Sequence, residues 1–290
     1  MAVVRNCSNQ CAERVDSSWP VRLAPVVFAL AILMFGGLLV SEAETATSFA
    51  KAAGPAGVET PSPIPPGIIL PARLESTLSV KDAHRGDAIE ARVAQDVPLP
   101  DRGEIRARSV VHGTVLAVEK DTGGPGVKLT LGFRQIEDRK ESLSAITSLR
   151  ALASYRSVQS AQMSLTGPDS GTPAGWANTV QIGGDIRFGD GGLVRNRAKQ
   201  KVGKGVLGGV LVHVKANPVL GCDGPVNGDD HPQALWVFSA DACGVYGLKG
   251  VQISQKGNKP PFGEITLRFE KEDMKLEPGT GMLLRVVAQP

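Results

Sequence analysis

The chain has 290 residues, with 32 Lys and Arg against 29 Asp and Glu and a formal net charge of +3. This near balance argues against nucleic-acid binding, which usually requires a strongly basic face. The chain also contains 34 Gly and 20 Pro, and only 4% of its residues are aromatic. Frequent turn formers between short apolar segments predict many short strands rather than long helices.

An uncharged apolar run, Ala24–Val40, follows three arginines near the N-terminus and precedes Ser41-Glu42-Ala43. This order of basic, apolar and small residues is typical of a secretory signal. The run is longer than a usual signal core and just short of a membrane span. Two interpretations stay open: cleavage after Ala43, or retention as a single-pass anchor to the inner membrane through residues 24–40. Both predict an extracytoplasmic location, in the periplasm, the cell envelope or the medium.

Composition divides the chain into four segments. Residues 1–23 form a short N-terminal region, 24–43 the signal peptide or anchor, 44–67 a Pro/Ala-rich linker, and 68–290 a β-rich domain. Prolines at short intervals predict that the linker is extended and disordered. Residues 166–204 are Gly-rich and polar, and we expect a long excursion there with one hairpin around residues 180–188.

Strand-like runs recur through the β-rich domain, and residues 157–165 fit a short helix. Thr114–Glu119 and Val127–Leu131 alternate apolar and polar residues, and the turn formers Asp121–Gly126 between them predict a hairpin. The expected fold is all-β, an antiparallel β-sandwich or partly closed barrel, preceded by an N-terminal hydrophobic helix and a disordered linker. The predicted strands are 68–75, 88–94, 110–118, 127–136, 143–152, 206–214, 234–239, 263–269 and 282–287.

The four cysteines fall on both sides of the apolar run. Cys7 and Cys11 precede it, whereas Cys222 and Cys243 lie in the exported part. Two cysteines in an oxidising compartment most simply pair, so a Cys222–Cys243 disulfide is predicted. Closing a loop of about 22 residues contributes roughly 3 kcal/mol by restricting the unfolded chain.

Oxygen-bearing side chains cluster in the loop that begins at Cys222. Carboxylates and amides at short spacing in a Gly-rich loop are calcium ligands, although the spacing matches no EF-hand. The same residue types also form ordinary surface turns, so both interpretations stay open. No further metal site is expected, because the four histidines are scattered. The candidate calcium ligands are Asp223, Asn227, Asp229, Asp230 and, brought close by the predicted disulfide, Asp241.

Other motifs are weaker. Trp176, in a Gly/Pro loop, is a candidate platform for stacking a sugar ring, whereas Trp236 is expected in the core. The glycines of residues 203–208 match a dinucleotide motif, but a β-branched run follows them in place of a helix, so we expect a turn and no cofactor. No nucleophile and base are assembled, so no catalytic residue is predicted. A basic run suits either a solvated loop or contact with anionic envelope polymers or lipid headgroups; it comprises Arg195, Arg197, Lys199, Lys201 and Lys204.

The start of the β-rich domain reads ILPARLESTLS over Ile69–Ser79, GDAIEARVAQDV over Gly86–Val97 and VHGTV over Val111–Val115. This pattern resembles the β-domain of bacterial envelope proteins related to the TrbI-like conjugation family. The resemblance implies a β-barrel or sandwich in the periplasm or outer membrane, without enzyme activity. The C-terminal part, residues 233–247 and 281–286, is similar to uncharacterised exported bacterial proteins.

The sequence therefore predicts a non-enzymatic, exported cell-envelope protein that acts in binding or assembly. Its expected partners are envelope proteins or polymers, and the membrane through residues 24–40 if the segment is uncleaved. The alternative is a secreted carbohydrate- or calcium-binding module, and an exported hydrolase is the least favoured interpretation.

Overall fold

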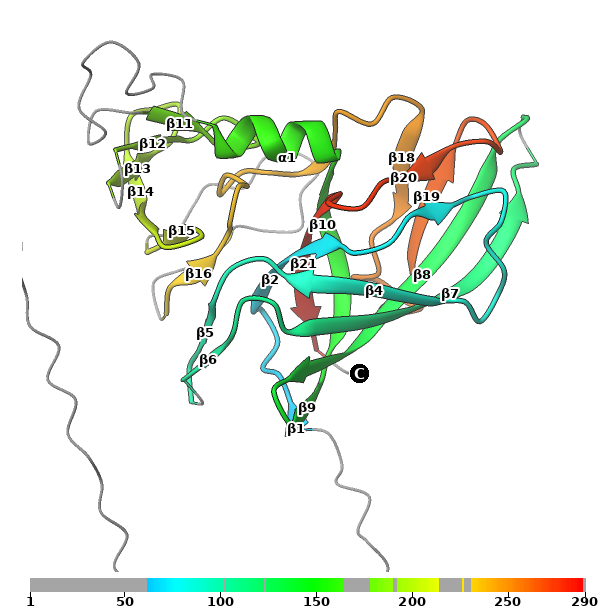
Figure 1. Ribbon diagram of the computed structural model, residues 1–290, viewed down its shortest axis with the longest axis horizontal. Helices are drawn as coiled ribbons and strands as arrows, with labels where there is room; N and C mark the ends of the chain where they lie inside the picture. The colour runs from blue at the N-terminus through cyan, green and yellow to red at the C-terminus, as the bar shows by residue number, and fades with distance from the viewer. Residues whose placement is uncertain are drawn as a thin grey trace, which may run out of the picture. The chain divides into compact units, whose positions relative to one another are not determined.

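A large mixed sheet and a smaller antiparallel sheet make up most of the described chain (Figure 1). The computed structural model describes residues 62–101, 103–122, 124–163, 178–189, 192–213, 226 and 231–288. These lie in one unit, Val58–Pro290. Within the described ranges the chain forms 21 strands and one short helix, which confirms the all-β class.

The large sheet is antiparallel except at two pairs, β1 with β9 and β10 with β17. The hairpin β18–β19 joins it through β19, which pairs with β8. The same hairpin also contacts β10, where the backbone N–H of Leu149 donates to the carbonyl of Lys256, the residue after β18, at 2.8 Å. The strand order is β1 (Ser62–Pro63), β9 (Glu141–Ser144), β8 (Val127–Asp138), β7 (Val110–Lys120), β4 (Ala88–Val93), β2 (Ile69–Leu74), β21 (Gly281–Val287), β10 (Ile146–Ala153) and β17 (Gly244–Tyr246), with β18 at Val251–Gln255 and β19 at Ile265–Phe269.

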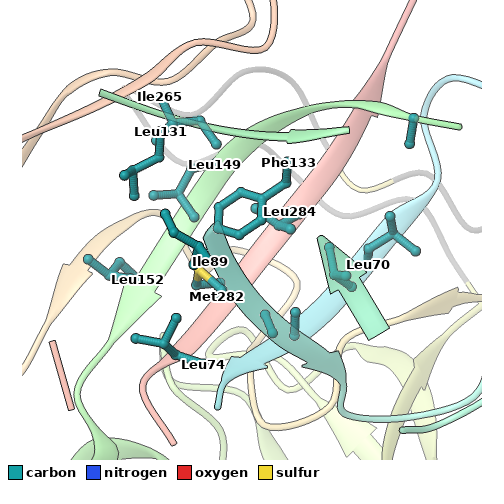
Figure 2. Close-up of a cluster of buried hydrophobic side chains, with 14 of the residues drawn as sticks. Leu70, Leu74, Ile89, Leu131, Phe133, Leu149, Leu152, Ile265, Met282 and Leu284 are labelled. Atoms are coloured by element: carbon teal, nitrogen blue, oxygen red, sulfur yellow. The ribbon is translucent and has the colours of Figure 1, made fainter. Parts of the chain in front are cut away.

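Alternate residues of this sheet point their apolar side chains into one main core, and Ile69, Ala151 and Leu283 on its other face join a second apolar cluster with the helix α1 (Tyr155–Gln162) and residues 235–238. Figure 2 shows aliphatic side chains from several strands gathered around Phe133. Gly113 of β7 lies opposite Phe133, and a Cβ atom there would lie 2.5 Å from the phenyl ring. Glycine at this position therefore makes room for the aromatic ring. The labelled side chains are Leu70, Leu74, Ile89, Leu131, Phe133, Leu149, Leu152, Ile265, Met282 and Leu284.

The second sheet is antiparallel throughout and has a small core of its own, formed by Val194, Val202 and Val210. The helix α1 (Tyr155–Gln162) connects the end of β10 to it (Figure 1). Ser154 caps α1 by accepting a hydrogen bond from the Ser157 N–H. The strand order is β11 (Asn178–Val180), β12 (Ile186–Phe188), β13 (Leu193–Arg195), β14 (Lys201–Val206), β15 (Gly209–Val212) and β16 (Gln233–Ala234). Two short ribbons complete the fold, β3 (Leu78–Ser79) with β20 (Lys275–Leu276), and β5 (Val97–Leu99) with β6 (Gly103–Ile105).

Several predicted elements are confirmed. The hairpin around residues 121–126 is β7–β8, the hairpin at 180–188 is β11–β12, and the short helix is present two residues earlier than expected. The glycines of residues 203–208 lie in the hairpin β14–β15, as the sequence indicated when it predicted a turn in place of a dinucleotide site. The predicted strand 143–152 divides at Ala145 into β9 and β10.

Two predictions about the second half of the chain are wrong. The excursion at 166–204 contains β13 and most of β14 in addition to one hairpin, because Val194 and Val202 anchor these strands in a small core. The predicted strand 234–239 ends at Ala234, because the backbone of Trp236 is left-handed, with φ of 53°, and turns the chain.

The structure also bears on the predicted linker and membrane segment. Residues 62–67, expected in the linker, belong to the folded unit, since β1 pairs with β9 and Ile64 is buried. The predicted hydrophobic helix at 24–43 and the linker up to residue 61 lie outside the described residues. In the part of the chain that the structure describes, no helix is long and apolar enough to cross a membrane.

Candidate functional site

Strand pairing gives the second sheet two faces of opposite character. Arg187 of β12 lies opposite Thr179 of β11 and Val194 of β13, so these three side chains share one face. Thr179 and Val194 are buried, which identifies this as the inner face. The intervening residues of each strand point the other way and form the outer face.

The outer face combines exposed apolar side chains with basic ones. Val180, Phe188 and Leu193 are 37%, 40% and 39% exposed. Leu193 pairs with Lys204 across the strands, and Arg195 pairs with Lys201. We use "outer face" for these six residues together with Ile186, the partner of Val180: Val180, Ile186, Phe188, Leu193, Arg195, Lys201 and Lys204.

Exposed apolar side chains concentrate in this part of the molecule. Every large apolar side chain that is exposed among the described residues lies in α1, directly after it, or in the second sheet. The large sheet has none. Scattered exposed apolar residues are ordinary, whereas a concentration on one element is typical of an interaction surface. The six are Tyr155, Met163, Val180, Phe188, Leu193 and Leu207.

The same segment carries the positive charge of the chain. Residues 155–213 hold seven basic and three acidic side chains, a net +4, while the whole chain has +3. One of the acids, Asp185, is buried. This positive charge also affects His213. Burial is the largest cause that lowers the pKa of His213, and the charges of Lys204 and Lys201 lower it further. An anionic partner would meet favourable electrostatics here.

A hollow of about 190 Å³ lies between the end of α1 and the hairpin β14–β15. Arg187 reaches it from the inner face, and Trp236 closes one side. The lining residues are Ala161, Gln162, Gln181, Arg187, Gly208, Gly209, Trp236 and Val237. A wider hollow of about 470 Å³ lies on the other side of α1, where Arg156, Ser157 and Ser160 face Val180 and Tyr246.

Gln95, in the segment between β4 and β5, fixes one wall of the narrow hollow. Its buried side-chain oxygen accepts hydrogen bonds from the N–H groups of Val210 at 3.1 Å and Trp236 at 2.7 Å, and its nitrogen donates to the Val210 carbonyl at 3.0 Å. A Cβ on Gly209 would lie 2.7 Å from the Trp236 Cα, so glycine is required for this close approach. Together these contacts hold Trp236 in its left-handed conformation.

Gln181 fixes the opposite wall. The Gln181 amide is oriented so that its nitrogen faces the segment after β16. This nitrogen donates to the carbonyls of Trp236 at 3.2 Å and Val237 at 3.3 Å. The backbone N–H of Ile182 also donates to the Val237 carbonyl, at 2.8 Å. The hollow is therefore built on backbone held by two glutamines, and its shape is defined without a ligand.

Among the described residues that line the narrow hollow, Arg187 is the one with a charged side chain. Its Nη2 donates to the Thr179 hydroxyl at 3.3 Å, and its buried Nε has no hydrogen-bond partner among the described residues. None of the ion pairs found in the described ranges involves Arg187. A guanidinium in such a setting has unused donors for an anion.

Behind the second sheet lies a polar cluster centred on Asp185. Its Oδ2 accepts a hydrogen bond from the Ala240 N–H at 2.9 Å, and Arg150 donates to the carbonyls of Ala240 and Ala242. Burial raises the pKa of Asp185 to about 6, the Ala240 N–H opposes this shift, and the nearby charge of Asp241 adds to it. Burial likewise raises the pKa of Asp241, against the influence of Arg150 and Arg197.

Most of the site residues predicted from the sequence lie outside the described residues. Of the candidate calcium ligands the structure describes only Asp241, which it places beside Asp185 and Arg150. Cys243 is disulfide-bonded, and its pairing with Cys222 stays a prediction. The described residues contain no group of three metal-binding side chains. Outside the description lie Ala43, Trp176, Cys222, Asp223, Asn227, Asp229 and Asp230.

Sequence reasoning noticed the basic run but missed Arg187, Gln95 and Gln181. The only sequence signal for Arg187 is a charge between two apolar residues, Ile186 and Phe188, which alternation alone assigns to a solvated face. The site as a whole offers a basic, partly apolar surface and a small hollow with a guanidinium, a combination suited to binding anions. No protein-family model, curated protein or solved structure matches the chain.

Proposed function

We propose that this chain is an exported, non-enzymatic cell-envelope protein whose outer face binds an anionic membrane surface. The observation that carries the proposal is the coincidence on one face of three exposed apolar side chains and three basic ones. Basic residues are attracted to anionic headgroups, and exposed apolar side chains enter the boundary between headgroups and acyl chains. An acidic polymer would use the basic residues alone.

Export is proposed from the apolar run and the small residues up to Ala43, and both cleavage and anchoring are compatible with binding. An uncleaved anchor through residues 24–40 would already hold the folded unit near the lipid surface. The resemblance to TrbI-like envelope proteins agrees with a periplasmic or envelope location.

For the large sheet we propose a partly closed barrel. The order of paired strands runs from β8 through β7, β4, β2 and β21 to β10. From β10 the Leu149 to Lys256 hydrogen bond leads to β18, which pairs with β19, and β19 pairs again with β8. Such a ring would give the second sheet a rigid support.

Lysine footprinting of the full chain tests the function directly, whether or not the anchor is present. The chain is reconstituted in vesicles of phosphatidylcholine alone or with phosphatidylglycerol, and the acylation rate of each lysine is measured. Lys201 and Lys204 should react several-fold more slowly in the anionic vesicles, and salt should reverse the protection. Lys249 and Lys275, exposed outside the second sheet, serve as internal controls.

Two substitutions separate the apolar from the electrostatic contribution. The Phe188→Ser, Leu193→Ser double variant should lose protection in anionic vesicles while its fold, measured by circular dichroism, is kept. Equal reactivity of Lys201 and Lys204 in the two kinds of vesicle would rule out the proposed function.

A calcium-binding module is the second candidate, and one observation favours it. Asp241 Oδ1 is buried without a hydrogen-bond partner among the described residues. The positive charges of Arg150 and Arg197 nearby oppose a cation. If calcium binds, it should raise the melting temperature of the wild type and leave that of Asp241→Asn unchanged. An identical melting temperature with and without calcium would exclude this candidate.

A further inference from the structure

We infer that the narrow hollow beside α1 is a binding site for a single oxyanion group, a phosphate or a carboxylate, recognised by Arg187. The site is separate from the outer face, because Arg187 belongs to the inner face of the second sheet. The inference therefore stands or falls independently of membrane binding.

The first support is the unpaired charge. Arg187 lies between two buried cross-strand neighbours, Thr179 and Val194. Removing a guanidinium from water is costly unless its donors find acceptors. Its hydrogen bond to Thr179 is long at 3.3 Å, and in the described part of the chain the buried Nε has no acceptor. An oxyanion supplies the missing charge and acceptors, and the planar guanidinium matches two of its oxygens.

The second support is the composition of the lining. Around Arg187 lie two amides, Gln162 and Gln181, the indole-bearing Trp236 and small residues, and none of the described lining residues carries a carboxylate. Gly208 and Gly209 line the hollow with backbone alone. Nothing in this lining competes with an incoming anion for the guanidinium.

The third support is size and preorganisation. A volume of about 190 Å³ corresponds to roughly six waters at the ~30 Å³ that each occupies in the liquid, so the hollow suits one small group rather than a polymer. Gln95 and Gln181 hold the walls in place through backbone hydrogen bonds. A preformed site avoids the entropy cost of ordering on binding.

Titration of the full chain in a neutral detergent tests the site. Inorganic phosphate and acetate are added in separate arms, and the Arg187 Nε–H and Trp236 indole resonances are followed by NMR. We expect a saturable shift of both signals with at least one anion, and a rise in melting temperature that tracks saturation. A response to phosphate alone or to acetate alone identifies which oxyanion the hollow takes.

Variants decide whether Arg187 is responsible. Arg187→Gln should abolish the saturable shift of the Trp236 signal, and Arg187→Lys should weaken binding at least tenfold, because a lysine cannot make the bidentate contact. Arg195→Gln, on the outer face, is the matched control and should bind as the wild type does. If neither anion produces a saturable shift, or if Arg187→Gln responds like the wild type, the inference is overturned. Circular dichroism confirms that each variant is folded before titration.

Discussion

The large sheet and the second sheet are stabilised in different ways. The large sheet packs around one extensive apolar core that draws on most of its strands, whereas the core of the second sheet's own strands comprises three valines among the described residues. The second sheet joins the rest of the molecule through a second apolar cluster, in which Val212 and residues 235–238 pack with Ile69 and Leu283 of the large sheet, and through polar side chains that bond to its backbone. The candidate sites both lie on the second sheet, in the region where specific hydrogen bonds supplement a smaller apolar core.

Three buried polar residues contribute to this attachment. Gln95 bonds to Val210 and Trp236, and Gln233 accepts a hydrogen bond from the backbone N–H of Ile69 at 3.1 Å. Arg150, on β10, donates to the loop after Trp236. Regions held in this way open locally at lower free energy than a continuous core does. The second sheet is therefore expected to be the less stable part, and substitutions in the two regions should differ in kind.

The largest expected effect comes from the large core. Phe133→Ala removes a fully buried ring and should lower the free energy of unfolding by about 3–5 kcal/mol. Because the cavity would lie opposite Gly113, which has no side chain to fill it, little relaxation is expected. Chemical denaturation measures the loss, and hydrogen exchange should show faster exchange in both sheets. Phe133→Leu, the matched control, should cost less than half as much. A loss below 1 kcal/mol for Phe133→Ala would contradict the importance of this core.

A smaller and more local effect is expected for Gln95. Gln95→Leu removes three buried hydrogen bonds and leaves the N–H groups of Val210 and Trp236 without an acceptor, at a cost of about 3 kcal/mol. Hydrogen-exchange mass spectrometry should show lost protection in residues 193–212, with β7 and β8 unchanged. The same substitution at the exposed Gln252 controls for the change of side chain. Uniform loss of protection in both sheets would contradict the idea that the second sheet is a separately attached unit.

The third prediction concerns the pH dependence of the polar cluster. The folded-state pKa of Asp185, about 6, lies above the ordinary value of 3.8. The folded state thus holds the proton more tightly, so this contribution to stability is complete below pH 4 and is lost as the pH rises through 6. The loss is at most about 3 kcal/mol.

Asp185→Asn should remove this dependence, since the amide oxygen can still accept the Ala240 N–H. We expect the variant to be more stable than the wild type at pH 8 and similar to it at pH 4, as measured by urea denaturation at each pH. Asp101→Asn, at an exposed turn, controls for the loss of one charge. A variant less stable than the wild type at pH 8 would mean that the Asp185 carboxylate is stabilised by its neighbours rather than penalised by burial.

The comparison also explains which parts of the fold were predictable. Strands of the large sheet alternate over long runs, as in Val127–Leu131, and tight turns separate them, so their pattern alone indicated a hairpin. The second sheet has short strands with many glycines and lysines, for example Lys201–Val206, and its small core gives too few apolar residues for a periodic signal. Its strands β13 and most of β14 therefore fell within the predicted excursion, whereas β15 lies in the predicted strand 206–214.

The candidate sites were harder to predict for a related reason. Trp236 was expected in the core and is buried, but its left-handed backbone depends on Gln95, 141 residues away, and on Gly209. Arg187 can be recognised as a candidate site residue only once its buried cross-strand neighbours, Thr179 and Val194, are known. Contacts between residues distant in sequence leave no local pattern, so the inner hollow could not be inferred, whereas the charge of the outer face was visible in the basic run.

The smallest effect is expected on the outer face, where a substitution should change electrostatics without changing stability. Lys204→Gln removes a charge that lowers the pKa of His213, so that pKa should rise, which NMR titration of the imidazole measures. Since Lys204 is exposed, the free energy of unfolding should stay within about 0.5 kcal/mol of the wild type. Lys275→Gln removes one positive charge outside the second sheet and should leave the pKa of His213 unchanged. If Lys204→Gln instead destabilised the chain as Gln95→Leu does, the outer face would be part of the attachment and the proposed division between a binding face and a supporting core would fail.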